Sequence, residues 1–366
     1  MRIGIDLLWV RVGKCGGTES YIRNLLDGFQ KYDGSNEYVL FVARDNEESF
    51  RHYGEKNGFT LHICPINCAN QAKRILWENL HLDRTAKKEE IDVMFIPVYS
   101  KPWTYGNGIP YVTVIHDLQA LHFPEYFSCL RRMFLKYAWW NTCSTSDTII
   151  TISNYCRDDL VAKYPCVKDK IYTIYNPIIS KPSNLTFSDI REKFDICEEK
   201  YFYCVSSILP HKNLSTILYV MLRRKERGMT EEKFVVSGVG GDVESIQKIV
   251  QELDIQDMVI FTGFVTDQER DCLYENCLLF LFPSIFEGFG MPPIEAMRKG
   301  KNVVTTECAC LKEVTEGKAF YVKEPMDVEE WLERIEEAEK TPAHVERFEK
   351  YNLENVVGQY RQVLEI

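Results

Sequence analysis

Two glutamates flank a glycine- and proline-rich turn in the stretch LFPSIFEGFGMPPIEAM, residues 281–297. Glu287 and Glu295 have neither an Asp nor a His alongside them, so they need not act as a general acid and base. Carboxylates accept hydrogen bonds well from vicinal hydroxyls, as does the acid that binds a ribose in dinucleotide-binding folds. One glutamate could therefore hold a sugar ring and the other a ribose. The alternative is a plain strand–turn–helix with two solvated acids.

The turn follows the apolar run CLLFLFPS, which predicts a strand. Pro292 and Pro293 suit the first turn of a helix, where a missing N–H costs nothing, and Gly300 suits the helix end. Residues Gly288–Met291 then form a loop that leads into a helix N-terminus. Backbone N–H groups and the positive end of the helix dipole favour a phosphate at such a loop.

Three further positions could serve the same ligand. Lys212 begins the helical pattern NLSTILYVM, and a lysine there opposes the helix dipole unless an anion is bound; the alternative is a solvent-facing lysine. Gly16 and Gly17 precede another helical pattern and allow close backbone approach, or else form only a tight turn. His116 ends an apolar strand, where a purely structural role is the alternative.

Composition excludes several classes of protein. The 366 residues carry a net charge of −10, which argues against a general nucleic-acid binder. No run of eighteen or more apolar residues occurs, so no membrane span is expected. Thirteen scattered cysteines without a secretory leader indicate free thiols in a reducing cytoplasm. No D-x-D motif and no cluster of metal-ligating residues occurs, so we expect neither a metal site nor a cofactor.

The strands and helices that would position these residues are indicated by patterns that recur along the chain. Six apolar runs in the first half and six in the second alternate with helical patterns: RIGIDLL, YVLFVA, TLHICPI, VMFIPV, YVTVIHD, TIITIS, YFYCVSS, KFVVSG, MVIFTGF, LLFLFPS, NVVTT and AFYV. This order predicts two doubly wound α/β domains with parallel sheets. The proline-rich linker YNPIISKPSNLTFSDIREKF separates them, so the domains are expected at residues 1–178 and 179–343.

Residues 344–366 are expected to form a C-terminal amphipathic helix that could pack on either domain, because several apolar residues share one helical face: Leu353, Val356, Val357, Tyr360 and Leu364. The segment CLRRMFLKYAWWN also predicts a helix, with an apolar face of Leu130, Met133, Phe134, Tyr137 and Ala138 beside Arg131, Arg132 and Lys136. Packing against the core of the first domain is the favoured interpretation of that helix. Contact with an anionic membrane is the alternative.

The motifs together resemble glycosyltransferase family 4, retaining enzymes of the GT-B fold with two facing Rossmann-like domains. The spacing E-x7-E in EGFGMPPIEA is similar to the family's signature. The segments GKCGGTESYIRNLL, TVIHDL, TISNYCRDDL, SSILPHKNLSTIL and FTGFVTDQERDCLY resemble further family motifs in the same order. The resemblance extends along the whole chain and is strongest from Tyr201 to about Pro325.

The resemblance implies a role for each matching residue. In the C-terminal domain, Glu295 would bind the ribose of a nucleotide-diphosphate sugar, and Glu287 with the backbone of Gly288, Phe289, Gly290 and Met291 would hold the transferred sugar. Lys212 would neutralise the diphosphate and Val265 would pair its backbone with the base. In the N-terminal domain, which would bind the acceptor, Gly17 beside Gly16 would approach the diphosphate and His116 would lie beside the anomeric centre.

The sequence departs from the family at two places. His211 and Lys212 stand where the family has Arg-Lys, and Ser206 and Ser207 stand where many members have Gly-Arg. If His211 faces the diphosphate, the negative charges should favour its protonated form, and binding should take up protons near neutral pH. The alternative is a His211 that points to solvent and leaves the charge to Lys212.

The expected activity is transfer of a sugar, with retention, to a hydroxyl of a glycan or lipid-linked acceptor in cell-surface polysaccharide synthesis. The expected location is cytoplasmic, with possible peripheral contact to a membrane. Two alternatives stay open, a GT-B-like sugar-nucleotide epimerase and a non-catalytic sugar-nucleotide-binding partner. The sugar, the base, the acceptor and the oligomeric state are not indicated by the sequence.

Overall fold

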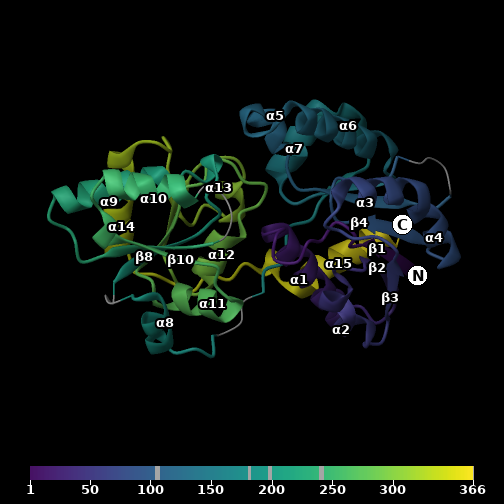
Figure 1. The fold of residues 1–366 in the computed structure, drawn as a ribbon, viewed down its shortest axis with the longest axis horizontal. Coiled ribbons are helices and arrows are strands. Elements are labelled where there is room, and N and C mark those ends of the chain that lie inside the picture. The colour runs from purple at the N-terminus through teal and green to yellow at the C-terminus, as the bar shows by residue number, and fades with distance from the viewer. Residues whose placement is uncertain (104–107, 180–182, 197–199, 239–242, 366) are drawn as a thin grey trace. The chain divides into compact units, whose positions relative to one another are not determined.

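The protein, described here by a computed structural model, divides into two compact units. The structure describes residues 1–103, 108–179, 183–196, 200–238 and 243–365. Unit 1 comprises Met1–Ile179 and Glu349–Ile366, and unit 2 comprises Ser180–Phe348 (Figure 1). Part of the expected linker, residues 180–182 with Pro182, lies outside the described residues.

Unit 1 is built on a seven-stranded sheet in which all neighbouring strands run parallel. The strand order is β3-β2-β1-β4-β5-β6-β7, so the chain reverses its direction of winding after β3. The strands are β1 (Arg2–Asp6), β2 (Glu37–Ala43), β3 (Phe59–Cys64), β4 (Val93–Ile96), β5 (Tyr111–Ile115), β6 (Thr148–Thr151) and β7 (Ile171–Thr173).

The strand β7 is the only one of these that the apolar runs did not predict. It has three residues, and Tyr172 at its centre is 44% exposed because β7 lies at the sheet edge. By contrast, β4 and β5 are buried along their whole length. Continuous burial produces the apolar runs that sequence patterns detect, whereas the three residues of β7, one of them a threonine, form no such run.

The helices of unit 1 include the last helix of the chain. They are α1 (Gly17–Tyr32), α2 (Arg51–Gly54), α3 (Gln71–Trp77), α4 (Asp83–Lys88), α5 (Gln119–His122), α6 (Cys129–Thr145), α7 (Asn154–Lys163) and α15 (Leu353–Leu364), with a π-helical segment at Glu78–Leu82. Helix α15 lies beside α1 (Figure 1). The Tyr21 and Tyr360 hydroxyls are 2.6 Å apart, and Gly28 leaves room for Val357.

Helix α6 packs against the core of unit 1, as the favoured interpretation expected, but most of its predicted apolar face does not make that contact. Leu130 is 81% exposed, Met133 63% and Tyr137 43%. The apolar residues that α6 buries are Leu135, Ala138, Trp139 and Cys143, which pack with the core around β6 or lie beside it. Both faces of this helix are apolar, so periodicity alone could not identify the buried one.

Unit 2 is built on a six-stranded parallel sheet of order β10-β9-β8-β11-β12-β13. Its strands are β8 (Tyr201–Val205), β9 (Lys233–Ser237), β10 (Val259–Gly263), β11 (Leu279–Phe282), β12 (Val303–Thr306) and β13 (Phe320–Val322). Its helices are α8 (Phe187–Phe194), α9 (Leu214–Glu226), α10 (Val243–Glu252), α11 (Asp267–Asn276), α12 (Met291–Arg298), α13 (Leu311–Val314) and α14 (Val328–Lys340). Helices α9 and α10 cover one side of these strands, and α8 and α11 lie on the other (Figure 1).

In the core of unit 2, the apolar faces of α9, α10 and α14 pack against the strands. Trp331 and Ile335 of α14 are fully buried there, and so is Ile217 of α9. This packing fixes the carboxyl ends of the strands, from which the candidate site is built. Cysteines in the described ranges are all free thiols, as expected. Of the helices in these ranges, none combines the length and hydropathy that crossing a bilayer requires.

Candidate active site

The loop between β11 and α12 is shaped by Gly290. This residue has φ 83°, in the left-handed region, and a Cβ built on it would lie 2.8 Å from Leu311 Cδ2. Both the backbone conformation and the close approach therefore call for glycine. Pro292 and Pro293 occupy the start of α12, as expected, and neither offers an N–H. Of the first three residues of α12, only Met291 carries a backbone N–H, so backbone donors for a ligand here must come from Gly288–Met291.

The structure brings together Lys212 and Glu287. The Lys212 ammonium lies 2.5 Å from Glu287 Oε1, and the two side chains are 17% and 13% exposed. Lys212 ends a short 3-10 turn, and Asn213 (φ 54°) links it to the start of α9, whose first turn holds no acidic residue. Glu287 therefore supplies the anion that a lysine at this helix start requires. A diphosphate at Lys212 would compete with Glu287 for the same ammonium.

Glu295 is held by two residues of α11. Tyr274 donates its hydroxyl to Glu295 Oε2 at 3.0 Å, and Arg270 Nε lies 3.9 Å from the same oxygen. Because Tyr274 is fully buried, its hydrogen bond fixes the carboxylate in one orientation. Within the described ranges Oε1 has no hydrogen-bond partner, and the side chain stays 19% exposed. That oxygen can accept hydrogen bonds from a ligand's hydroxyls.

His211 is buried, with 7% of its surface exposed, and does not point to solvent. Burial lowers the pKa of His211 to about 4, with the neighbouring Lys212 charge acting in the same direction. The ring is therefore neutral at pH 7. A bound diphosphate would have to lift this pKa from about 4 to above 7 before binding took up a proton near neutral pH. The expected proton uptake at neutral pH does not fit this environment.

Val265 lies between the end of β10 and the start of α11, at the carboxyl edge of the same sheet. Thr266 caps α11 by accepting from the Glu269 N–H, while the Glu269 carboxylate accepts from the Thr266 N–H. This capping box fixes the backbone directly after Val265. The side chain of Val265 is partly exposed.

Gly16 and Gly17 stand at the start of α1 in unit 1. Gly16 has φ 55° and ψ −136°, and a Cβ added to it would meet no atom within 4 Å. Conformation therefore favours glycine at this position, and the space beside it is open to a ligand. Glu19 in the first turn accepts from the Gly13 N–H at 2.9 Å and pairs with Arg23 at 2.9 Å. The Arg23 charge offsets the carboxylate next to this glycine loop.

His116 follows the carboxyl end of β5, also in unit 1. Its Nε2 lies 2.8 Å from the Pro97 carbonyl oxygen, which can only accept, so Nε2 carries the proton. Burial lowers the pKa of His116 to about 4, so the ring is neutral and Nδ1 can accept a hydrogen bond. The Tyr21 ring packs edge-on at 5.0 Å, and its hydroxyl meets that of Tyr360. Helix α15 thus supports His116 through Tyr21.

Two residues that hold Glu295 were not predicted from the sequence. Arg270 and Tyr274 are four residues apart and so share one face of α11. That spacing is visible in the sequence, but nothing in it shows which element the face contacts. As for metals, the described ranges contain no group of three or more His, Cys, Asp or Glu side chains able to hold an ion.

Two family models match the chain. The family described as "Glycosyltransferase Family 4" matches residues 15–180, and "Glycosyl transferases group 1" matches residues 186–354. Between them they span both units. The chain belongs to glycosyltransferase family 4, and its two parallel-sheet units form the GT-B fold.

Several curated proteins are similar to this chain at about a quarter sequence identity. The O-antigen chain mannosyltransferase RfbU of Salmonella typhimurium is 27% identical over 253 residues, 67% of this chain and 67% of that protein. The O-antigen chain mannosyltransferase B of Escherichia coli is 26% identical, and the match covers 60% of this chain and 58% of that protein. The uncharacterized glycosyltransferase MJ1607 of Methanocaldococcus jannaschii is 24% identical over 96% of this chain and 94% of its own length.

Solved structures share the fold at still lower identity. Anabaena HepE in complex with UDP-glucose has a TM-score of 0.69 and 17% identity, covering 100% of this chain and 95% of that one. WaaG, a glycosyltransferase involved in lipopolysaccharide biosynthesis, has a TM-score of 0.67 and 14% identity, covering 97% and 94%. These likenesses concern the fold alone.

Proposed function

We propose that this protein is a retaining glycosyltransferase that moves a sugar from a nucleotide-diphosphate sugar to a hydroxyl of a glycan or lipid-linked acceptor. The observation that supports this most is the pair of Lys212 and Glu287 beside the Gly290 loop, with Glu295 one turn into α12. The cation Lys212, the proposed sugar-binding carboxylate Glu287 and the proposed ribose-binding carboxylate Glu295 then lie at the carboxyl edge of the sheet in unit 2. Open α/β sheets bind nucleotides at such an edge.

Donor binding rearranges the pair of Lys212 and Glu287. The diphosphate carries more charge than one carboxylate and takes the Lys212 ammonium as its partner. Glu287 is released from Lys212 and accepts hydrogen bonds from hydroxyls of the sugar. The carboxylate is thus available to the sugar only once the diphosphate is in place, which couples the two halves of donor recognition.

The reaction places little chemistry on the protein itself. The bond between the anomeric carbon and the diphosphate breaks as the acceptor oxygen bonds to the same face, and the acceptor's proton passes to a departing diphosphate oxygen. The Lys212 ammonium stabilises the charge that develops on the leaving group. His116, neutral and with Nδ1 available, accepts a hydrogen bond from the sugar near the anomeric centre. Orientation and charge stabilisation supply the rate enhancement.

The names of the relatives and the ligands of the structural neighbours suggest which substrates the protein uses. The names of the curated relatives favour mannose as the sugar and cell-surface polysaccharide chains as the acceptors. The HepE complex favours a nucleoside diphosphate as the leaving group. The stereochemistry is tested by proton NMR of a product made from an α-linked nucleotide sugar. An α-linked product is expected, and a β-linked product would overturn the assignment of retention.

The exposed face of α6 supports peripheral contact with an anionic membrane from the cytoplasmic side. Leu130, Met133, Tyr137 and Trp140 are exposed, and Trp103 packs edge-on against Tyr137 at 5.1 Å. Basic side chains on the same helix, Arg132 and Lys136, complement an anionic surface. In sedimentation with phosphatidylglycerol vesicles, Leu130→Glu should reduce binding, whereas Leu80→Glu, a matched change at another exposed leucine, should not. Equal binding by both variants would contradict membrane contact through α6.

A further inference from the structure

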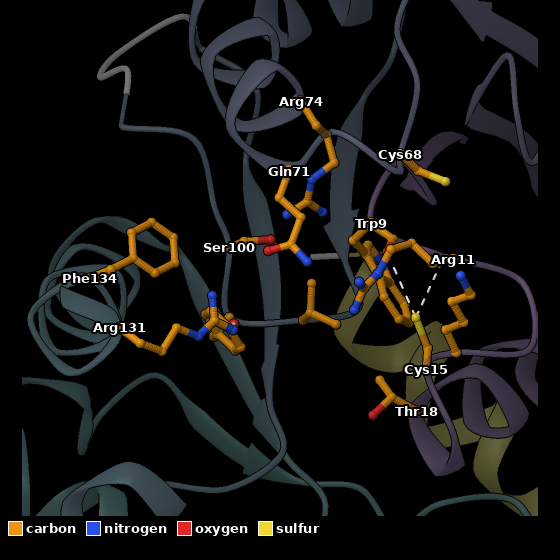
Figure 2. Close-up of a pocket in the computed structure, with 13 residues that line it drawn as sticks. Trp9, Arg11, Cys15, Thr18, Cys68, Gln71, Arg74, Ser100, Arg131 and Phe134 are labelled. Atoms are coloured by element: carbon orange, nitrogen blue, oxygen red, sulfur yellow. Dashed lines mark hydrogen bonds between the residues drawn. The ribbon is translucent and has the colours of Figure 1, made fainter. Parts of the chain in front are cut away.

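A cleft of about 300 Å³ in unit 1 lies outside the residues assigned above. Its walls come from separate segments: the loop after β1, the start of α3 and helix α6. Figure 2 shows Arg11, Arg74 and Arg131 reaching it from these three segments. Lys14, Cys15 and Thr18 line it from either side of the Gly16 and Gly17 pair. The cleft therefore adjoins the glycine loop, at the carboxyl edge of the seven-stranded sheet.

The cleft is strongly basic although the chain is acidic. Four of its lining residues are Arg11, Lys14, Arg74 and Arg131, and none is acidic, whereas the chain carries a net charge of −10. Among the residues that the structure describes, Arg11, Lys14 and Arg131 form no ion pair with a carboxylate. Cations gathered without counter-charges repel one another, so an anionic ligand would be favoured between them.

Arg74 is the buried member of this group. It is 9% exposed, and its Nε and Nη1 make no hydrogen bond with the described residues. Glu78 Oε1 lies 3.5 Å from Nε. Burial raises the pKa of Glu78 above its ordinary range, with the Asp6 charge acting in the same direction, and burial raises the pKa of Asp6 to about 6; the Arg74 charge opposes both shifts. Because burial disfavours the charged forms of Asp6 and Glu78, these two acids neutralise the Arg74 charge only in part. The remainder of that charge is available to a ligand.

Aromatic and hydroxyl groups complete the lining. Trp9 is held by a 3.0 Å bond from its Nε1 to the Asp6 carbonyl oxygen, and Tyr99 accepts from Arg131 at 2.8 Å. Ser100 Oγ is buried without a hydrogen-bond partner among the described residues. Aromatic rings suit the apolar face of a sugar, while Ser100 and Gln71 can bond its hydroxyls.

We propose that this cleft binds a phosphate group carried by the acceptor, next to the sugar that receives the transferred residue. The acceptor role rests on the proposed function, whereas the phosphate site stands on the cleft itself. Guanidinium groups match phosphate oxygens through paired hydrogen bonds. The positive charge that the three segments bring to the cleft is larger than the charge of a single carboxylate ligand. The cleft is at the small end of ligand sites, about 300–1,000 Å³, which suits one sugar ring with its phosphate.

The test uses binding calorimetry on the full chain in a Lys212→Gln background, so that the donor's cation does not contribute. The probes are methyl α-mannoside, mannose 1-phosphate and polyprenyl phosphomannose in detergent. Mannose 1-phosphate should bind at least tenfold more tightly than the mannoside. Arg11→Gln and Arg131→Gln should each weaken that binding about tenfold, the usual effect of a lost bond to a charged group. The exposed Arg84→Gln, outside the cleft, is the matched control.

Each result decides the proposal. Arg74→Gln leaves Asp6 and Glu78 without a buried counter-charge and could unfold unit 1, so Arg11 and Arg131, which have no such partners, carry the test. Equal affinity for the mannoside and mannose 1-phosphate would overturn the phosphate site, as would Arg11→Gln and Arg131→Gln variants that bind like Arg84→Gln. Tighter binding of polyprenyl phosphomannose than of mannose 1-phosphate would assign the phosphate to a lipid carrier, and equal binding to a soluble sugar phosphate. These measurements need no turnover, so their failure is distinct from a failure of sugar transfer.

Discussion

Glu287 and Glu295 carry the same charge but are held by different partners, and this difference supports the division of roles proposed for them. Glu287 is paired with an ammonium that a ligand can take over, whereas Glu295 is fixed by the buried hydroxyl of Tyr274. The sequence motifs predicted both acids and Lys212. The supporting Tyr274 and Arg270, and the arginines of the basic cleft, could not be predicted, because their convergence depends on how helices pack.

Removing the carboxylate of Glu287 and removing that of Glu295 should have different effects on nucleotide binding and on sugar transfer. Glu295→Ala should weaken binding of a free nucleoside diphosphate by about 1.5–3 kcal/mol, the range for a hydrogen bond to a charged group. Glu287→Ala should spare that binding, or strengthen it, since Lys212 loses its competing partner, and should reduce transfer. Calorimetry with the diphosphate and a transfer assay measure the two effects. Equal loss of nucleotide binding in both variants would show that the division is wrong.

His211 should make the stability of the protein depend on pH. Its folded pKa of about 4 lies below the ordinary value of 6.5, so between these pH values the unfolded chain binds more protons than the folded one. Stability is fully present above pH 6.5 and is lost as pH falls towards 4. His211→Gln should therefore lose less stability than the wild type between pH 7 and pH 5 in urea denaturation. The exposed His344→Gln is the control, and parallel losses in all three proteins would contradict the buried, neutral His211.

At the scale of elements, apolar runs predicted twelve strands because buried parallel strands are continuously apolar. They missed the three-residue strand β7, although they found the partly exposed edge strands β3, β10 and β13, and they did not identify the buried face of α6. The C-terminal helix α15 shows a third limit. Its apolar face is visible in the sequence, but its partner, α1, is more than 300 residues away along the chain.

The contact of α15 with α1 can be tested at Gly28. Replacing glycine by alanine within a helix ordinarily stabilises by roughly 0.5–1 kcal/mol. Here the new Cβ would lie 2.7 Å from Val357 Cγ2, so Gly28→Ala should instead destabilise by about 1–3 kcal/mol. Adding Val357→Ala should recover part of the loss, by a coupling of about 0.5–3 kcal/mol. Strictly additive unfolding energies would show that α15 does not pack against Gly28.

At the scale of the whole molecule, two parallel-sheet units match the GT-B fold, and the motifs in their order predicted that fold from the sequence. What the chain transfers, and to what, depends on side chains at the ends of the strands and not on the fold. The basic cleft in unit 1 and the carboxylates of unit 2 are such groups.

Metal independence is a prediction at this scale, motivated by the missing D-x-D motif. Turnover of donor should survive an excess of EDTA, because Lys212 supplies the positive charge at the diphosphate. Loss of turnover under EDTA, restored by Mn²⁺ or Mg²⁺, would refute it.

Release of nucleoside diphosphate from GDP-, UDP- and ADP-sugars, with and without acceptor extract, tests the central claim most directly. Sugar transfer predicts that one donor releases its diphosphate faster when acceptor is present. Lys212→Gln and Glu287→Ala should abolish that increase, while the exposed Arg84→Gln retains it. Conversion of the sugar nucleotide without acceptor would identify an epimerase instead. Tight binding of a donor with no turnover under any condition would indicate a non-catalytic binding protein, and either result would contradict the proposed function.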